Sequence, residues 1–292
     1  MRVLVVGATG VVGRGVVALL GEAGHDVRAL IRPTSDPQAV AAVTATGATT
    51  VTGDLADAAS IAAALDGVDA VVSTATAIGS QTPSDSLSGV DLDGQLRLVD
   101  LARQASVKRF VYVSVLGLQP NSPFTSAKLA VEERLRGSGL EYTIVAPSIF
   151  MDTWLSHHVG FDWEGNVATI YGDGTQKLGW VSAQDVATVV AATVDHAGSA
   201  NATVPVVGPD SMTPLQVVSV FEELTGKPFT VEHVPAEALE AQRAGSEDPT
   251  EQSFAALMLR YAAGDPPATP MAGLPSPATS VRDYAQQLLG TS

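Results

Sequence analysis

Short apolar runs alternate with longer amphipathic segments along the first half of the chain. The runs are rich in β-branched residues and indicate buried strands, whereas the segments between them group apolar residues three or four positions apart and indicate helices. The predicted strands are Arg2–Val6, Val27–Ile31, Thr49–Thr52, Ala70–Ser73, Arg109–Ser114 and Tyr142–Val145. The predicted helices are Val11–Glu22, Gln38–Ala45, Ala58–Leu65, Leu87–Ala105 and Ser126–Arg136. Alternating strands and helices imply right-handed crossovers, so we expect an α/β, doubly wound parallel-sheet Rossmann fold.

In the second half the alternation becomes irregular, and the pattern predicts a smaller unit of α+β type. The predicted extended segments are Asn166–Ile170 and Lys177–Val181 around a glycine turn, then Thr203–Val207 and Phe229–Val234. The predicted helices are Asp185–Val194, Thr213–Thr225, Pro235–Arg243, Gln252–Ala263 and Val281–Leu289. Thr213 is expected to cap its helix and Gly226 to end it. We expect residues 1–150 to form the Rossmann domain and residues 151–292 the smaller C-terminal substrate lobe, with 183–207 returning to the main sheet.

The first predicted strand runs into a turn with three glycines, spaced G-x-x-G-x-x-G, and the first helix begins inside that turn. The first glycine permits the tight turn, the second lets the backbone approach a pyrophosphate, and the third lets the helix lie close to the strand. Such a turn also occurs without a ligand, but a position between a strand and a helix is the context that a dinucleotide site requires. The residues predicted to contact the dinucleotide here are Gly7, Thr9, Gly10, Val11, Val12 and Gly13.

The end of the second predicted strand distinguishes between two dinucleotides. Proteins that bind NAD usually carry an acid ~20 residues after the glycines, where it bonds the ribose hydroxyls. Here the strand ends in Arg32, whose guanidinium matches a 2′-phosphate, so we predict NADP(H) rather than NAD(H). An exposed strand-end charge is the alternative for Arg32, and Asp36 could still bond a ribose hydroxyl. Asp54 and Leu55, after the third strand, are predicted to contact the adenine, with a helix N-cap as a second role for Asp54.

Several stretches of the chain resemble the NmrA-like group of atypical short-chain dehydrogenases/reductases, which includes triphenylmethane-reductase-like and isoflavone-reductase-like enzymes. The matching stretches are GATGVVGRGVV at Gly7–Val17, GDLAD at Gly53–Asp57, VKRFVYVSVLG at Val107–Gly117, AKLAVEERLRGSGLEYTIVAPSIFMD at Ala127–Asp152 and GWVSAQDVA at Gly179–Ala187. The resemblance extends to about Val234 and implies an NADP(H)-dependent reductase of a ketone, quinone or conjugated double bond.

The resemblance also implies where protons move. In short-chain dehydrogenases a Ser, a Tyr and a Lys four residues after the Tyr handle the proton that accompanies the hydride. Ser114 matches the Ser and Lys128 matches the Lys, but Phe124 stands where the Tyr is expected. Three candidates for the proton donor therefore stay open: Lys128, water and His157. A histidine is a candidate because the imidazole side chain ordinarily titrates near neutral pH. The structural alternatives are a strand-end hydroxyl for Ser114, an exposed helix lysine for Lys128 and a surface histidine for His157.

By the same resemblance, two loops flank the cofactor and a set of aromatic side chains flanks the substrate. The loop after the fourth strand packs along the cofactor, and the residues after the sixth strand border the nicotinamide. The assigned residues are Thr74, Ala75, Lys128, Pro147 and Ile149 for the cofactor, with Lys128 bonding the nicotinamide ribose, and Phe124, Phe150 and Trp154 for a substrate pocket suited to an aromatic compound. Ordinary packing of the second lobe is the alternative for the aromatic set.

Composition excludes several classes of function. The formal net charge of -15 disfavours nucleic-acid binding, which requires a basic face. The chain has no cysteine, and no His, Asp or Glu residues show ligand spacing, so we predict no metal site. No apolar run approaches the ~20 residues of a membrane helix. We expect a cytoplasmic, bacterial protein, monomeric or homodimeric, whose partner is a small molecule.

Two further functions stay open because the Tyr is missing. A non-catalytic NADP(H) sensor that binds a protein partner would need the cofactor site but no proton donor. An isomerase or cyclase that keeps its cofactor bound would need both the cofactor site and the substrate pocket, but its product would not be a reduced compound.

Overall fold

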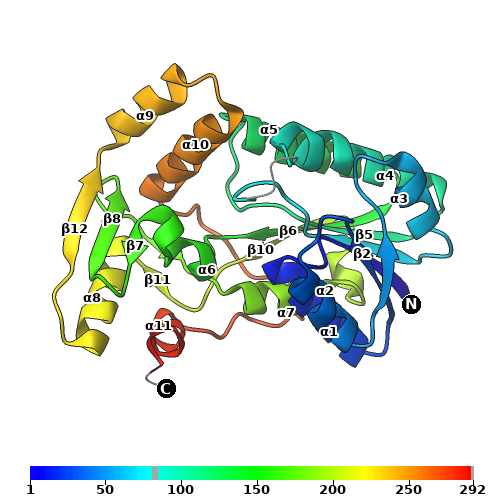
Figure 1. The fold of residues 1–292 in the computed structure, drawn as a ribbon, viewed down its shortest axis with the longest axis horizontal. Helices are drawn as coiled ribbons and strands as arrows, with labels where there is room; N and C mark the ends of the chain where they lie inside the picture. The colour runs from blue at the N-terminus through cyan, green and yellow to red at the C-terminus, as the bar shows by residue number, and fades with distance from the viewer. Residues whose placement is uncertain (81–84, 291–292) are drawn as a thin grey trace.

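The computed structural model describes residues 1–80 and 85–290, and its main feature is a seven-stranded parallel sheet (Figure 1). The strands follow the order β10-β6-β5-β4-β1-β2-β3. Their bounds are β1 Arg2–Val6, β2 Asp26–Ile31, β3 Thr49–Thr52, β4 Ala70–Ser73, β5 Arg109–Val113, β6 Glu141–Pro147 and β10 Ala202–Val206. The order reverses between β1 and β4, which opens a crevice at the carboxyl ends of those strands. The predicted doubly wound α/β fold is confirmed.

Helices cover both faces of this sheet (Figure 1). On one face lie α1 Val11–Glu22, α2 Pro37–Ala45 and α7 Ala183–Thr193; on the other lie α3 Ala58–Ala64, η1 Leu87–Gly94, α4 Gln95–Gln104 and α5 Pro123–Arg136. The strands alternate their side chains between the two resulting cores: Val3 and Val5 face α1, whereas Leu4 and Val6 face α3 and α4. A sheet covered on both faces explains why its central strands β1, β4 and β5 are largely apolar, whereas the edge strand β3 is rich in threonine and mostly exposed.

The helix predicted over Leu87–Ala105 is wrong in its first half. Residues 87–94 form a π-helical segment, and the α-helix begins only at Gln95. Apolar spacing over eight residues does not distinguish i→i+4 from i→i+5 bonding, so the pattern could not reveal the change. Similarly, α5 begins at Pro123, three residues before its predicted start, because Ser122 forms a capping box with Thr125.

Two elements from the second half of the chain lie on the main sheet. Strand β10 pairs in parallel with β6, and α7 packs against α1. The close approach of these helices depends on Gly15, where an added Cβ would lie 2.8 Å from the Cβ of Ala187. The domain boundary at residue 150 stays a prediction, and the last two residues of the predicted lobe lie outside the described part of the chain.

The remaining elements form a smaller lobe beyond the carboxyl edge of the sheet (Figure 1). Its strands are β7 Phe161–Asp162, β8 Val167–Tyr171, β9 Leu178–Gly179, β11 Ser211–Met212 and β12 Thr230–Val234. Its helices are α6 Met151–Trp154, α8 Pro214–Thr225, α9 Ala236–Gly245, α10 Pro249–Ala263 and α11 Val281–Leu289, and it contains the short 3-10 turn η2 His157–Val159. The second 3-10 turn, η3 Ala197–Ser199, lies beside β10 of the main sheet. The two extended segments predicted around the glycine turn belong to different sheets, since β8 pairs with β7 and β12, and β9 with β11.

Candidate functional site

The glycine turn lies at the crevice where the strand order reverses. Gly7 has a φ of 83°, in the left-handed region that favours glycine, and the N–H of Gly10 donates to the carbonyl oxygen of Gly7 over 3.0 Å. A Cβ on Gly13 would lie 2.1 Å from that same oxygen. The turn and the close packing of α1 on β1 therefore require glycine at Gly7 and Gly13.

The N-terminus of α1 is open for an anion. Gly10 is the N-cap residue and offers no side-chain acceptor to the first turn of the helix. Val11, the first helical residue, is 58% exposed although it is a large apolar side chain, and Thr9 and Val12 are half-buried. Outward N–H groups and a partial positive charge at a helix N-terminus suit a phosphate. These residues fit the pyrophosphate of a dinucleotide.

The loop after β4 lies directly against this turn. The hydroxyl of Thr74 donates to the carbonyl oxygens of Val6 and Gly7 over 3.3 and 3.2 Å. A Cβ on Gly7 would lie 2.7 Å from the backbone nitrogen of Ala75. Two segments almost seventy residues apart thus form one wall of the crevice, as the prediction for Thr74 and Ala75 requires.

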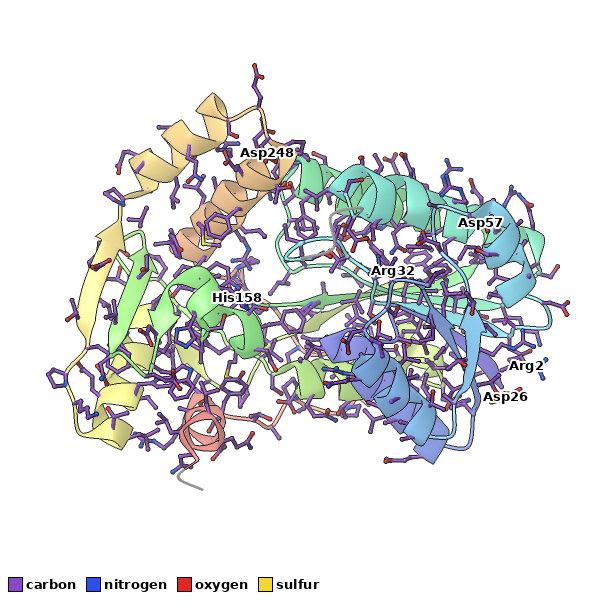
Figure 2. All side chains as sticks on the ribbon, viewed as in Figure 1. Arg2, Asp26, Arg32, Asp57, His158 and Asp248 are labelled. Carbon is purple, nitrogen blue, oxygen red and sulfur yellow. The ribbon has the colours of Figure 1, made fainter. Side chains whose placement is uncertain are left out.

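Arg32 leaves the carboxyl end of β2 and pairs with an internal carboxylate (Figure 2). Its guanidinium donates to Oδ1 of Asp85 over 2.5 Å, and the hydroxyl of Ser80 donates to the other oxygen, Oδ2, over 2.7 Å. The side chain of Asp85 is only 7% exposed and that of Arg32 is 33% exposed. Arg32 is therefore not an unpaired charge at the end of a strand. Its guanidinium, which we predicted to bind a phosphate, pairs with the carboxylate of Asp85 in this structure.

The two acids considered for ribose and adenine are used locally. Asp36 caps α2 by accepting from the N–H of Ala39. Asp54 accepts from the N–H of Ala56 over 2.8 Å in the turn before α3, while Asp57 is the N-cap of α3 (Figure 2). The N-cap role considered for Asp54 is therefore wrong, because the N-cap of α3 lies three residues later, at Asp57. Leu55, predicted beside Asp54, is buried in the core under α3 and α4.

Lys128 and Phe124 lie together at the base of α5. The Lys128 ammonium nitrogen is 3.6 Å from Oδ1 of Asp91 and donates to the carbonyl oxygen of Val113, the last residue of β5, over 3.3 Å. It also lies 4.9 Å from the centre of the Tyr112 ring and 5.5 Å from the centre of the Phe124 ring. The Lys128 side chain is 5% exposed, so the alternative of an exposed helix lysine is wrong.

Burial and charge act in opposite directions on this lysine. Burial lowers the pKa of Lys128, and the carboxylate of Asp91, followed by that of Glu132, opposes the decrease. Burial also raises the pKa of Tyr112 well above its ordinary value, and the same two carboxylates raise it further. Tyr112 therefore remains a neutral phenol next to a lysine whose charge depends on its acidic neighbours.

Ser114 is held by a second buried carboxylate. Its hydroxyl donates to Oε1 of Glu132 over 2.5 Å, and Oε2 of Glu132 accepts from the guanidinium of Arg136 over 2.8 Å. Phe124, Lys128, Glu132 and Arg136 follow one another at intervals of four along α5, so they share one face of the helix. Ser114 is thus not a free strand-end hydroxyl, and its oxygen belongs to a charged network.

His157 lies apart from this network. Its ring is 55% exposed and faces the carboxylates of Asp162 at 3.4 Å and Glu164 at 4.0 Å. The neighbouring His158 lies among the elements of the smaller lobe (Figure 2). These contacts agree with the surface alternative for His157 rather than with a place beside Lys128.

The predicted pocket residues are mostly engaged in packing. Trp154 stacks on Tyr261 with ring centres 4.2 Å apart and an interplanar angle of 4°, so one face of its ring is covered. Phe150 directly precedes α6, and its backbone forms an isolated parallel β-bridge with that of Val181. Pro147 is the last residue of β6, and Ile149 is buried in the core of the smaller lobe. Of these residues, Trp154 and Phe150 retain partial exposure and could face a substrate.

Sequence reasoning missed Asp85, Asp91, Tyr112 and Glu132. A signal for Asp91 was available, since a carboxylate on the apolar side of a predicted helix must find a buried partner. Among the described residues no group of His, Asp and Glu could hold a metal ion. No helix within 1–80 and 85–290 is both long and apolar enough to cross a membrane.

The chain is similar to known proteins in sequence and in fold. Residues 1–260 match the NmrA-like family, which confirms the resemblance. The chain is 31% identical over 230 residues to the NAD(P)H azoreductase of Xenophilus azovorans, covering 77% of this chain and 74% of that relative. It is 30% identical over 245 residues to the photosystem II assembly factor Ycf39 of a Synechocystis species, covering 83% and 73%. The solved structure of AtPrR2 with NADP+ and (+)pinoresinol is 28% identical, with a TM-score of 0.71 over 87% of this chain and 85% of that one.

Proposed function

The chain belongs to the NmrA-like family, and we propose that it is an NADP(H)-dependent oxidoreductase that reduces a ketone, a quinone or a conjugated double bond. The observation that carries this proposal is the meeting of the open N-terminus of α1 with the loop of Thr74 and Ala75 at the crevice. An azoreductase that uses NAD(P)H and a structure containing NADP+ among the similar proteins support it.

The cofactor site consists of backbone on one side and Arg32 on the other. The N–H groups of Val11 and Val12 would hold the pyrophosphate, and Gly10 leaves room for it. Arg32 would hold the 2′-phosphate in place of its present partner, the carboxylate of Asp85. The nicotinamide, when bound, supplies the hydride.

The proton comes from Lys128 in this proposal. Lys128 lies beside Phe124, which cannot donate a proton, whereas His157 is exposed and faces two carboxylates elsewhere. The Lys128 ammonium group releases a proton to the oxygen or carbon that has become negative, and the resulting amine regains one from water. Phe150 and the free face of Trp154 border the substrate, and an aromatic compound is the proposed class. A bacterial cytoplasmic setting and a monomeric or homodimeric state stay predictions.

Steady-state oxidation of NADPH tests the function. The purified protein is assayed against quinones, azo dyes, aromatic ketones and enones, with NADH in parallel. We expect turnover with at least one class and a higher kcat/KM with NADPH than with NADH. Binding of NADPH without turnover of any compound on the panel would contradict the proposal of a reductase.

A second candidate is a regulatory protein that binds NADP(H) without chemistry. The similarity to Ycf39, an assembly factor, favours it, as does the almost complete burial of Lys128 next to Phe124. Calorimetry with NADP+ and NADPH distinguishes the two candidates. A sensor should bind the two forms with different affinities or change its oligomeric state, whereas a reductase releases its oxidised cofactor during turnover.

A further inference from the structure

Asp91 is a buried carboxylate that has no role in the reaction proposed above. It lies on the π-helical segment η1 and is fully buried. Its Oδ2 accepts from the backbone N–H of Ala77 over 2.8 Å. Its Oδ1 has no hydrogen-bond partner within 1–80 and 85–290, and it faces the Lys128 ammonium nitrogen at 3.6 Å. Burial of a charged carboxylate is costly unless it is paired, so this position has a specific cause.

Short π-helical segments inside helices often occur at functional sites. Here the segment passes between the loop after β4 and the base of α5, which are the two sides of the proposed active site. The carboxylate of Asp91 contacts both sides at once, through Ala77 and through Lys128.

We propose that Asp91 is the positioning residue for Lys128: its carboxylate holds the ammonium group at the end of β5 and couples it to the loop that borders the glycine turn. This inference rests on the proposed function, because it assigns the charge state and the place of the proton donor in that reaction.

The other groups around the lysine do not replace Asp91. Glu132 also faces Lys128, but its two oxygens already accept from Ser114 and from Arg136. Tyr112 faces it from β5 with a buried hydroxyl that has no hydrogen-bond partner among the described residues. Asp91 is therefore the carboxylate with a free oxygen directed at the lysine.

Within the described part of the chain, the elements packed against the rest of α5 bring no unpaired charge to this place. From α10, the neutral hydroxyl of Ser253 accepts from the N–H of Phe124. From α4, Asp100 pairs with Arg134, further along the helix. From β6, apolar Ile144 packs into the same core. Burial has the largest effect on the pKa of Lys128, and among the charged groups around it Asp91 has the largest.

The role of Asp91 follows from the balance of the proton step. The N–H bond of the Lys128 ammonium group breaks, the proton joins the reduced substrate, and the lysine becomes a neutral amine that regains a proton from water. Burial lowers the pKa of Lys128 and so favours the neutral form before the reaction, while the negative charge of Asp91 favours the protonated form. The carboxylate of Asp91 therefore favours the form of Lys128 that can donate the proton.

The test is the variant Asp91→Asn, which retains an oxygen for the N–H of Ala77 but removes the charge. In the wild-type enzyme, kcat should fall as pH rises through the pKa of Lys128. In Asp91→Asn this fall should move to lower pH by about 1–3 units, the usual effect of an opposite charge at this distance. The KM for NADPH should change less than about twofold, since Asp91→Asn keeps an oxygen for the N–H of Ala77 in the loop beside the glycine turn.

Two matched variants separate this role from simple stabilisation. Asp93→Asn removes an exposed carboxylate from the same π-helical segment and should leave the pH profile unchanged. Asp91→Glu keeps the negative charge, so the fall of its kcat with pH should lie closer to that of the wild type than the fall in Asp91→Asn does. If Asp91→Asn lowers kcat equally at every pH, the inference is wrong and Asp91 is structural only.

A measurement without turnover distinguishes failure of this inference from failure of the proposed function. The Lys128 side-chain signal is titrated by NMR in the cofactor-free protein and is assigned by its loss in Lys128→Met. A lower pKa in Asp91→Asn than in both wild type and Asp93→Asn supports the inference even if no substrate is reduced. An unchanged pKa would overturn it, whatever the enzyme assay shows.

Discussion

Backbone groups form one side of the proposed active site, and buried side-chain charges form the other. At the glycine turn, the N–H groups of α1, left without a side-chain cap at Gly10, provide the binding surface. At the base of α5, Lys128 depends on the carboxylate of Asp91 and on the carbonyl oxygen of Val113.

The difference shows how each side should respond to change. A backbone site tolerates substitution of most side chains but not the addition of a Cβ where the chain passes close to itself, as at Gly13. A buried charge pair tolerates neither loss of a partner nor a change of protonation, because an uncompensated charge in a low-dielectric interior is strongly unfavourable. The first side should therefore be sensitive to shape and the second to pH.

The largest expected effect is that of Lys128→Met. Loss of a general acid costs typically 10²- to 10⁴-fold, so kcat should fall by about that factor while NADPH affinity stays within about threefold. Steady-state kinetics and calorimetry measure the two quantities. Lys108→Met, at an 80% exposed lysine, is the control. A large loss of cofactor affinity in Lys128→Met would show that the two sides are not independent.

The variant Gly13→Ala tests the backbone side. Its Cβ would lie 2.1 Å from the carbonyl oxygen of Gly7, so α1 must move away from the turn. Overpacking of this kind costs about 1–3 kcal/mol, and the displaced N–H groups should weaken NADPH binding by about 10- to 100-fold. Gly21→Ala, on the same helix, is the matched control because its nearest neighbour would be 3.8 Å away. Equal affinity in the two variants would contradict the proposed pyrophosphate site.

Arg32 and Asp85 test the choice of dinucleotide. Arg32→Ala should weaken NADPH by about 10-fold or more and leave NADH nearly unchanged, since a charge-assisted bond contributes about 1.5–3 kcal/mol. Asp85→Asn should instead tighten NADPH by a few-fold, because the phosphate no longer competes with an internal carboxylate. Calorimetry with both cofactors measures this. Equal changes in the affinities for NADPH and NADH would contradict the assignment of Arg32 to the 2′-phosphate.

The smallest expected effect concerns stability against pH. Burial lowers the pKa of Lys128 below its ordinary value of 10.5, so the unfolded chain binds this proton more tightly than the folded chain. The cost of burying the charge is present at lower pH and disappears as pH rises from the folded pKa towards 10.5. The free energy of unfolding of the wild type should therefore rise in that window relative to Lys128→Met, as measured by urea denaturation. A parallel course of the two curves would contradict the lowered pKa.

Local rules predicted the fold well. The alternation of strands and helices, the cap of α8 at Thr213 with its end at Gly226, and the bounds of α11 all appear in the structure as expected. These features depend on neighbouring residues, through apolar periodicity and helix capping, and therefore lie within reach of a sequence pattern. The π-helical segment 87–94 was not predicted, and the contacts of its Asp91 with the distant Ala77 and Lys128 are not visible to a local pattern.

The sequence by itself determined the turn of three glycines, the parallel sheet and the helix that carries Lys128. Only the tertiary structure decided that Asp91 faces Lys128, that Glu132 holds Ser114 and that Asp85 pairs with Arg32. The physical reason is range. A glycine turn and a helix are stabilised by bonds between residues that are near neighbours in the sequence. A buried ion pair joins residues that are far apart in the sequence, and they come close in space only when the elements pack.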